Sequence, residues 1–372
     1  MDSIPVDIIE VIGKRLDDID DHVRFGAVCK TWRSLKIGYK KSYTPWLMLP
    51  ERDENNSDGE QVHNNNRKFV CLSSGKTFNV YLPECQGSRC FGSPFGWLLT
   101  VGLDLNIHLL NPLTRVQLSL PPQRTFPFQS EYYIEPSHLR KIAVFKFVMS
   151  SSMPDSENDC IVMVICSQFN SLAFARPGDE TWTIIDSPPQ QAHSDILFFN
   201  GRFYAIHAGG ILRICEINEP VPKTIDFLPP PDDIELSDRF YLVEISGHLH
   251  LVARGLDQDQ NAPEDTGRYV TDWFEVYKLN FDAKKWIVLS DFGDYSIFIG
   301  TNSSFAISTS EYPGFKANYI YFTDDHEECY KFGGGHNMGF YDFDNQRFGS
   351  FYVGEDIISF FCPPLFFRPS LG

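Results

Sequence analysis

Cysteine side chains have the chemistry to bind a metal ion or to form disulfides, and their spacing decides between these uses. Cys85 and Cys90 are five positions apart and Cys160 and Cys166 are six apart, whereas zinc sites typically use Cys-x-x-Cys with a second Cys or His pair. The nine cysteines are scattered and odd in number. We therefore expect reduced, mostly buried thiols and no metal.

The sequence lacks the complete motifs of nucleotide-binding and hydrolytic enzymes. The segment Gly333–Gly339 lacks the Lys-Ser/Thr of a P-loop and precedes no apparent helix, so a turn or rim loop is expected. The sequence has no Gly-x-Ser-x-Gly elbow. His248 and His250 share a strand face without a nearby cysteine or carboxylate cluster, and we expect them to be solvent-facing or hydrogen-bonded. The acidic loop Asp257–Asp265 is expected to be solvated, with contact to a basic substrate as the alternative. We expect no enzyme activity and no cofactor.

Residues 3–41 are predicted to form short amphipathic helices. Ile8, Ile9, Ile12 and Leu16 follow the spacing of one helix face, and Pro5 suits the first turn. A second apolar face follows an acidic break, with i, i+3, i+4, i+7 spacing. It consists of Phe25, Val28, Cys29 and Trp32, extended by Leu35.

This helical segment is too short to bury its own apolar side chains. A core of such size supplies only about 3–5 kcal/mol. The apolar faces therefore need a further surface, which is either the rest of this chain, with the helices as an N-terminal cap, or another protein.

The order of residue types in the segment resembles the F-box motif. The stretch Ile4–Ile12, then Leu16, then Arg24–Leu35 is similar to Leu-Pro-x-Asp/Glu-Leu-Leu-x-x-Ile, a spacer, and Val-Cys-Lys-x-Trp-Arg. Ile4 replaces the usual Leu, a volume-conserving change. F-boxes bind a Skp-type adaptor, which joins them to a cullin–RING ubiquitin ligase. The resemblance implies an adaptor contact made or supported by Ile4, Pro5, Ile8, Ile9, Ile12, Leu16, Phe25, Val28, Cys29, Trp32 and Leu35.

The composition of the chain restricts the classes of partner that residues beyond 41 can bind. The 372 residues are 42% hydrophobic and include 32 Phe, enough for a large core. The net charge is −17, and residues 1–41 hold 8 Lys+Arg and 7 Asp+Glu, which leaves −18 on the rest. An acidic body is a poor partner for nucleic acid or anionic membranes. Without a signal-peptide pattern or an apolar run of about 20 residues, we expect an intracellular protein of the nucleus and/or cytoplasm.

Beyond residue 67 the sequence predicts short strands and turns. Residues 46–67 are predicted to be a linker, because Glu51–Arg67 contains almost nothing that would be buried. Asn200-Gly201 lies between two apolar runs and predicts a hairpin with a type I′ turn. Ser246-Gly247 repeats this signal.

A strand–polar turn–strand theme recurs along this region, at residues 110–118, 175–184, 279–288 and 341–348. Repeats of about 45–60 residues with four short strands each are typical of a β-propeller. We expect five to six degenerate blades, the sixth closed by Phe69–Leu72 with Ile357–Phe361. A pair of β-sandwiches is the alternative.

The strand region also resembles the KIB-type, kelch-like propeller of plant F-box proteins. The supporting segments are Gly96–Leu99, Leu110–Thr114, Leu120–Pro122 and Asn200–Tyr204. The resemblance implies a substrate-binding domain and names no substrate.

Together these patterns predict a small all-α module at 1–45, a linker at 46–67 and a large all-β domain at 68–368. The expected function is a substrate-recognition adaptor: the module docks on a Skp-type adaptor and through it on a cullin, and the propeller binds a target protein. The alternatives are a stand-alone propeller enzyme or ligand-binding module with a helical cap, and a Skp-binding protein that acts outside any ligase.

Overall fold

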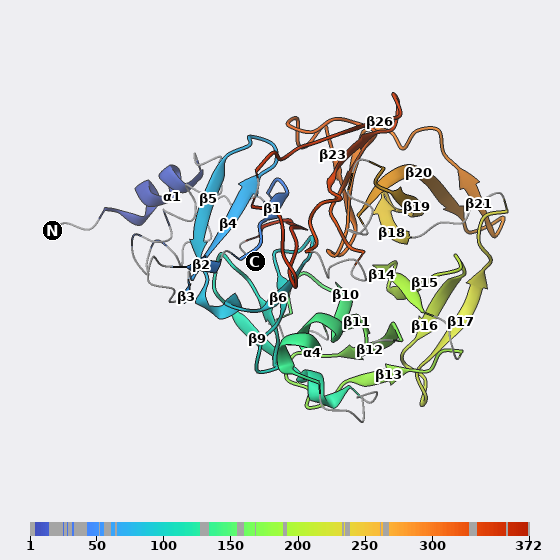
Figure 1. The fold of residues 1–372 in the computed structure, drawn as a ribbon, viewed down its shortest axis with the longest axis horizontal. Coiled ribbons are helices and arrows are strands. Elements are labelled where there is room, and N and C mark those ends of the chain that lie inside the picture. The colour runs from blue at the N-terminus through green and yellow to red at the C-terminus, as the bar shows by residue number, and fades with distance from the viewer. Residues whose placement is uncertain are drawn as a thin grey trace.

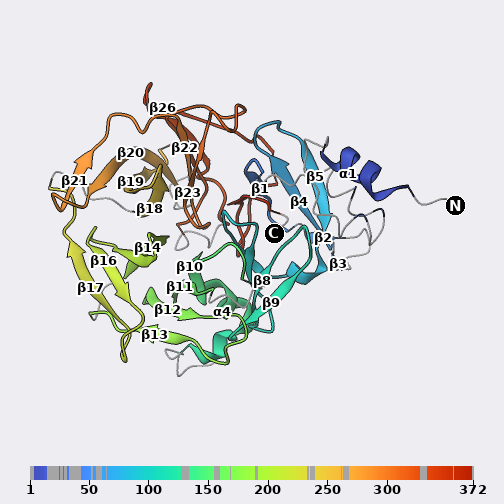
Figure 2. The same ribbon diagram turned by 180° about the vertical axis from the view of Figure 1, so that it is seen from behind.

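A computed structural model describes most of the chain, and its sheets form a ring. The described residues are 4–14, 25, 28, 32, 43–51, 53–55, 61–63, 65–126, 134–154, 160–167, 169–188, 192–232, 234, 239–260, 262, 268–326, 333–354 and 356–370. In them, six sheets of four or five strands surround a common centre (Figures 1 and 2). The predicted β-propeller is confirmed with six blades, and the β-sandwich alternative is wrong.

Blades II to V are simple antiparallel meanders of four strands. Blade II contains β6 (Arg89–Gly92), β7 (Leu98–Val101), β8 (Ile107–Leu110) and β9 (Gln117–Leu120). Blade III contains β10 (Val144–Met149), β11 (Val162–Cys166), β12 (Ser171–Ala175) and β13 (Thr183–Ile185). Blade IV contains β14 (His193–Phe199), β15 (Arg202–His207), β16 (Leu212–Glu216) and β17 (Lys223–Leu228). Blade V contains β18 (Arg239–Ile245), β19 (His248–Gln258), β20 (Tyr269–Asn280) and β21 (Lys285–Val288).

Both predicted glycine hairpins are present. Phe199 pairs with Arg202 across Asn200-Gly201, and both turn residues have positive φ, 47° and 77°. The same geometry recurs in blade V at Ser246-Gly247, with φ of 51° and 74°. Positive φ at both central positions is what a type I′ turn requires, and it fixes the register of each hairpin.

The blades pack face to face through shared apolar cores. The inner strands β10, β14 and β18 lie next to one another around the centre, and β18 continues to β23. The middle strands β7 and β11 are buried along their whole length, because a blade inside the ring has neighbours on both faces. Outer strands such as β9 and β17 expose half of their residues.

Two tryptophans tie neighbouring blades together through a repeated motif. Trp182 Nε1 donates to the carbonyl of Pro121 at 2.7 Å, and Trp286 Nε1 donates to the carbonyl of Pro229 at 3.1 Å. Each acceptor belongs to a Leu-Pro-Pro segment that begins at the last residue of the preceding blade's outer strand, where the prolines have no N–H to continue the ladder and so end the strand.

Blade I closes the ring with strands from both ends of the described chain. Its order is β27 (Leu365–Phe367), β1 (Trp46–Met48), β4 (Asn66–Cys71) and β5 (Thr77–Tyr81). Closure by both ends is confirmed, but the predicted pairing of Phe69–Leu72 with Ile357–Phe361 is wrong. Residues 46–48 lie between β4 and the C-terminal strand because Trp46, Leu47 and Met48 are apolar on both faces and fully buried.

Blade VI departs from the regular order. It contains β22 (Tyr295–Ile299), β23 (Phe305–Ser308), β24 (Tyr319–Phe322), β25 (Gly339–Asp342) and β26 (Arg347–Gly349). In space the order is β23-β22-β24-β25-β26, and β22 pairs with β24 in parallel. The hairpin β22–β23 therefore turns inward, and β23 rather than β22 faces the ring centre.

The part of the chain that the structure describes has few further elements. They are α1 (Val6–Lys14), α4 (Pro136–Ile142), the 3₁₀ turns Pro83–Cys85 and Gln123–Thr125, and the hairpin of β2 (Asp53–Asn55) with β3 (Gln61–His63). No helix among the described residues is long and apolar enough to cross a membrane.

The predictions for the linker and for the helical module both need correction. The 46–67 linker is interrupted, since β1 belongs to blade I and β2 and β3 form a hairpin. Short helices were predicted over residues 3–41, and the described residues of this segment contain one short helix, α1. Phe25, Val28 and Trp32 also have helical backbone. In Figure 1, α1 lies at the outer edge of blade I, beside β5.

Candidate functional site

Helix α1 carries an exposed apolar stripe. Its first turn is closed by Pro5, whose carbonyl accepts from the amides of Ile8 at 3.1 Å and Ile9 at 3.2 Å. Ile8 and Ile12 are four positions apart and so lie one turn from each other along α1, and Ile4, four positions before Ile8, precedes the first residue of the helix, Val6. The side chains of Ile4, Ile8 and Ile12 are 47%, 48% and 39% exposed. A stripe of three isoleucines in water is unusual for a helix that packs on its own domain.

The opposite side of α1 packs inside the module. Ile9 and Phe25 are buried against each other and against the half-buried Trp32. The ring centroids of Phe25 and Trp32 are 4.6 Å apart. This cluster orients α1 relative to the residues at 25–32, and it leaves Val28 59% exposed.

The predicted adaptor-contacting residues thus fall into two groups. An outer group is exposed and consists of Ile4, Pro5, Ile8, Ile12 and Val28. An inner group supports it and consists of Ile9, Phe25 and Trp32. Leu16, Cys29 and Leu35 lie outside the described residues. The prediction missed Val6 and Val11, each 48% exposed, although Val11 lies one turn from Ile8 and the same periodicity could have identified it.

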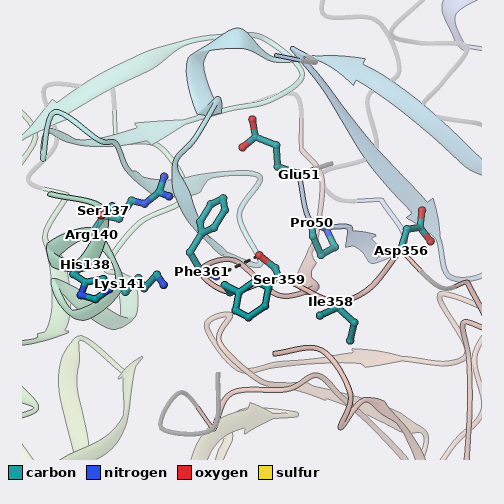
Figure 3. A pocket seen from close by; sticks show the side chains of 11 residues that line it. Pro50, Glu51, Ser137, His138, Arg140, Lys141, Asp356, Ile358, Ser359 and Phe361 are labelled. Atoms are coloured by element: carbon teal, nitrogen blue, oxygen red, sulfur yellow. Dashed lines mark hydrogen bonds between the residues drawn. The ribbon is translucent and has the colours of Figure 1, made fainter. Parts of the chain in front are cut away.

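A second candidate site is a pocket on one face of the propeller, between α4 and the segment that leads to β27 (Figure 3). Its volume is about 690 Å³. Phe360, 55% exposed, and Ile358, 37% exposed, supply its apolar side. Exposed aromatic and aliphatic side chains beside a hollow are common at protein-binding surfaces.

Cations dominate the other side of this pocket. The Arg140 guanidinium lies 4.1 Å from the Phe361 ring centroid. Burial, together with the nearby charges of Arg140 and Arg89, lowers the pKa of Lys141. The larger part of this effect is loss of water around the ammonium group, and the two neighbouring arginines add to it.

The two carboxylates that line the pocket are each paired with a cation. Glu51 lies 3.1 Å from the Arg67 guanidinium. Asp356 lies 2.8 Å from Lys68 Nζ. Burial alone would raise the pKa of Asp356, but the hydrogen bonds from Lys68 and Tyr352 and the Lys68 charge together outweigh burial, and the pKa falls to about 2. The pocket therefore presents apolar and positively charged groups to a partner.

The structure brings together three cysteines that the sequence separates. Cys90 and Cys362 are 272 positions apart, yet the Cys90 amide donates to Cys362 Sγ at 3.4 Å. Cys85 joins them in the same core, beside the buried Arg67 guanidinium. A hydrogen bond from Cys90, together with the Arg67 charge, lowers the pKa of the Cys362 thiol to about 6 despite its burial.

The structure also describes the cysteines, histidines and glycine-rich segment that the sequence offered as candidates for chemistry. The cysteines that the structure describes are free thiols, and no group of three metal-binding side chains occurs among the described residues. His248 and His250 each place Nδ1 within 3.0 Å of a backbone carbonyl, which confirms a hydrogen-bonded pair. Gly333 and Gly335 have φ of 89° and 116°, as expected of a turn.

Comparison with known proteins identifies the family of this chain. The KIB1-4 beta-propeller family matches residues 69–342, which covers blades II to V, the inner strands of blade VI and part of blade I. The chain belongs to the KIB1-4 beta-propeller family.

Several curated proteins of Arabidopsis thaliana are similar over nearly the whole chain. One putative F-box protein is 26% identical, covering 93% of this chain and 91% of its own length. Another is 27% identical and covers 87% and 89%. F-box protein SKIP23 is 26% identical and covers 83% and 80%. The resemblance to plant F-box proteins with a KIB-type propeller is thereby confirmed.

Proposed function

We propose that this protein of the KIB1-4 beta-propeller family is a substrate-recognition adaptor of a Skp–cullin–F-box ubiquitin ligase. The N-terminal module docks on a Skp-type adaptor, and the propeller holds a target protein. The protein performs no bond chemistry. It raises the effective concentration of the target near the ligase, which is how linked binding sites accelerate a second event.

One observation carries this proposal: the apolar stripe Ile4, Ile8 and Ile12 is exposed while Ile9 and Phe25 pack inside the module. Covering such a stripe with a partner removes apolar area from water at about 25 cal/mol per Å². The similarity to F-box proteins supports a Skp-type adaptor as the partner. The module ends before Tyr43, whose amide donates to the carbonyl of Pro369 at 3.3 Å and so belongs to the propeller.

Purified full-length chain and a Skp-type adaptor test the docking. We expect the double variant Ile8→Asp, Val28→Asp to lose adaptor binding by at least about 100-fold, as expected for charges placed in an apolar contact. Its melting temperature should stay near that of the wild type, because both side chains are exposed.

Val288→Asp is the matched control, since Val288 is 64% exposed on β21, far from the module. It should bind the adaptor like the wild type. Failure of the wild-type chain to bind, or undiminished binding by the double variant, contradicts the proposal. Co-purification of a cullin separates a ligase adaptor from a Skp-binding protein that acts elsewhere.

We place the target contact at the pocket of Figure 3, on the support of its exposed Phe360 and Ile358 and of its neighbouring cations. Proximity labelling in cells, with the proteasome inhibited, tests this assignment. Proteins labelled by the wild type should be lost with Phe360→Ser, Ile358→Ser and retained with Val288→Asp. Equal labelling by both variants would move the target contact elsewhere on the ring.

A stand-alone ligand-binding propeller is the second candidate, and a further pocket of about 320 Å³, lined by Lys146, His193 and Arg239 among others, favours it. In that case the helices would be a cap for the body. The described apolar residues of the module, Ile9 and Phe25, cluster with Trp32 and not with a blade, which favours the adaptor.

A further inference from the structure

Three thiols from distant parts of the chain meet where blade I joins blade II. Cys90 lies in β6, the inner strand of blade II, and Cys362 lies three residues before β27, the inner strand of blade I. Cys85, in a 3₁₀ turn between β5 and β6, joins them in one buried core. All three are free thiols, so the seam between the two blades holds a cluster of reduced sulfur.

Cys90 lies at the middle of this cluster. Its amide donates to Cys362 Sγ at 3.4 Å, and Cys362 Sγ lies 3.9 Å from the carbonyl oxygen of Cys90. The thiols of Cys85 and Cys362 each make a side-chain hydrogen bond with the thiol of Cys90. Sulfur atoms in such contact reach the length of a disulfide bond, about 2.0 Å, through a small movement of their side chains and backbone.

A buried cation beside these thiols has a hydrogen-bond donor to spare. Arg67 is 2% exposed, and its Nη2 donates to the carboxylate of Glu51 at 3.1 Å and to the carbonyl of Cys85 at 3.0 Å. Its Nη1 is buried without a hydrogen-bond partner among the described residues. The guanidinium interacts electrostatically with all three cysteines, and an anionic sulfur is the species that it stabilises.

This environment makes Cys362 the most reactive thiol of the cluster. The hydrogen bond from Cys90 and the charge of Arg67 lower the pKa of Cys362 to about 6 despite its burial. Burial without a neighbouring cation has the opposite effect at Cys166 in blade III, where it raises the pKa of the thiol to about 12. Because thiolates rather than thiols react with peroxides, we expect Cys362 to react first.

The pocket of Figure 3 gives a small oxidant a route toward the cluster. Phe361 lines this pocket and also packs against the apolar core that contains the three cysteines. Glu51 lines the pocket as well and is paired with Arg67. A small uncharged molecule in the pocket therefore reaches Cys362 when the half-buried side chain of the neighbouring Phe361 moves.

We propose that hydrogen peroxide converts Cys90 and Cys362 into a reversible disulfide that locks the ring at this seam. The Cys362 thiolate attacks one oxygen of the peroxide, the O–O bond breaks, and the departing hydroxide takes up a proton to form water. Cys90 Sγ then attacks the sulfenic acid on Cys362: the S–S bond forms, the S–O bond breaks, and hydroxide leaves with the Cys90 proton as a second water. The two thiols lose two electrons, and the peroxide gains them.

A bond at this position would join the two strands at which the ring closes. β6 and β27 already lie so close together that a Cβ added at Gly92 would clash with the carbonyl oxygen of Phe366. The Arg368 amide donates to the carbonyl of Ser93 at 3.2 Å. A disulfide there closes a loop of most of the chain, and long loops lose the most entropy in the unfolded state. This inference goes beyond the adaptor role and does not rest on it.

Peptide mapping of the full-length chain tests the pairing. The reduced protein is treated with hydrogen peroxide under native conditions, its remaining thiols are alkylated, and it is digested with trypsin without reduction. Cleavage after Lys and Arg, except before Pro, places Cys85, Cys90 and Cys362 in separate peptides, 77–89, 90–115 and 348–372. We expect peptides 90–115 and 348–372 to be joined, and dithiothreitol to separate them.

Thermal unfolding measures the effect on the ring. Oxidation should raise the melting temperature by about 3–5 °C, the shift expected of one cross-link in a chain of this length, and dithiothreitol should reverse it. Cys362→Ser should lose both the joined peptides and the shift. Cys166→Ser is the matched control and should keep both, because Cys166 is an equally buried thiol that lies in blade III.

Three results would overturn the proposal: no joined peptides from the native protein, a link of 90–115 to 77–89 in place of 348–372, or joined peptides without a change in melting temperature. Should Cys362→Ser fail to fold, the map of the wild-type chain still identifies the pair. Oxidised and reduced protein should bind the adaptor equally through α1, so the two proposals fail independently.

Discussion

The propeller buries its large apolar side chains, whereas the N-terminal module leaves several of its apolar side chains exposed. Around the ring, large side chains such as Trp46, Phe69 and Phe367 are at most 1% exposed. In the module, Ile4, Ile8 and Val28 are close to half exposed or more. The two regions have similar shares of hydrophobic residues, so the difference arises from geometry: a ring supplies neighbours on both faces of each blade, and one short helix supplies almost none.

The two regions also differ in how they use buried charge. The ring centre holds the pair of Lys146 with Asp195, in which Asp195 is completely buried and its pKa is raised by desolvation, an effect that Lys146 partly offsets. Lys146 also donates to the carbonyl of Gly300 at 2.8 Å. These contacts join blades III, IV, V and VI, so a polar cluster holds the ring while an apolar stripe faces solvent in the module.

Deletion of the C-terminal strand should have the largest effect. Removing residues 365–372 takes β27 out of blade I and exposes both β1 and the core that it shares with blade II. We expect loss of the cooperative thermal transition measured by calorimetry. A truncated chain that still melts cooperatively near the wild-type temperature would mean that β27 does not close the ring.

Breaking the buried charge pair should come next. Asp195→Leu leaves Lys146 as an unpaired buried cation and removes the acceptor of the Leu242 amide. We expect a loss of about 3–5 kcal/mol in the free energy of unfolding, measured with urea.

The control for this variant is Glu84→Gln, which breaks an ion pair with Arg115 whose side chain is 45% exposed. It should cost less than about 1 kcal/mol. Equal losses of stability for the two variants would mean that the buried ion pair at the ring centre contributes no more to stability than the exposed pair at the surface.

Acidification should weaken the ring through its buried histidines. Burial lowers the folded-state pKa of His193 and of His250 to about 4, from 6.5. Between these values the unfolded chain binds protons that the folded chain does not, so stability present above pH 6.5 is lost as the pH falls toward 4. Each histidine contributes up to about 2–3 kcal/mol.

Urea unfolding as a function of pH measures this loss. His250→Gln should reduce the slope of stability between pH 6.5 and 4, whereas the substitution of the exposed His248 by Gln should leave it unchanged. A pH profile that is the same for both variants and the wild type contradicts this account of the buried rings.

Deletion of the module should have the smallest effect on the ring. Removal of residues 1–42 keeps Tyr43 and β1, and the described apolar residues of the module pack with one another. We expect the free energy of unfolding of the propeller to change by less than about 0.5 kcal/mol, while adaptor binding disappears. A loss of several kcal/mol would instead identify the helices as a cap.

Local signals in the sequence identified the parts whose physics is local. The turns at Asn200-Gly201 and Ser246-Gly247 were predictable because positive φ at both positions needs such residues. The recurring strand–turn–strand theme proved to be the outer hairpin of a blade, as in β8–β9 and β20–β21. The face of α1 was predictable from a four-residue spacing.

Features that depend on distant residues were not predictable in the same way. The pairing of β27 with β1, the inward turn of β23, and the approach of Cys90 to Cys362 all join segments that carry no mutual signal in sequence. The Leu-Pro-Pro segments were visible, but their acceptance of Trp182 and Trp286 requires the next blade.

By itself, the sequence determined that this chain has an apolar helical N-terminus and an acidic body of repeated hairpins, because periodicity, turn chemistry and charge are properties of neighbouring residues. The tertiary structure alone decided how many blades close the ring, which isoleucines of α1 face solvent, and which side chains meet at the ring centre. Those outcomes depend on burial, and burial is set by residues that come together only when the ring is complete.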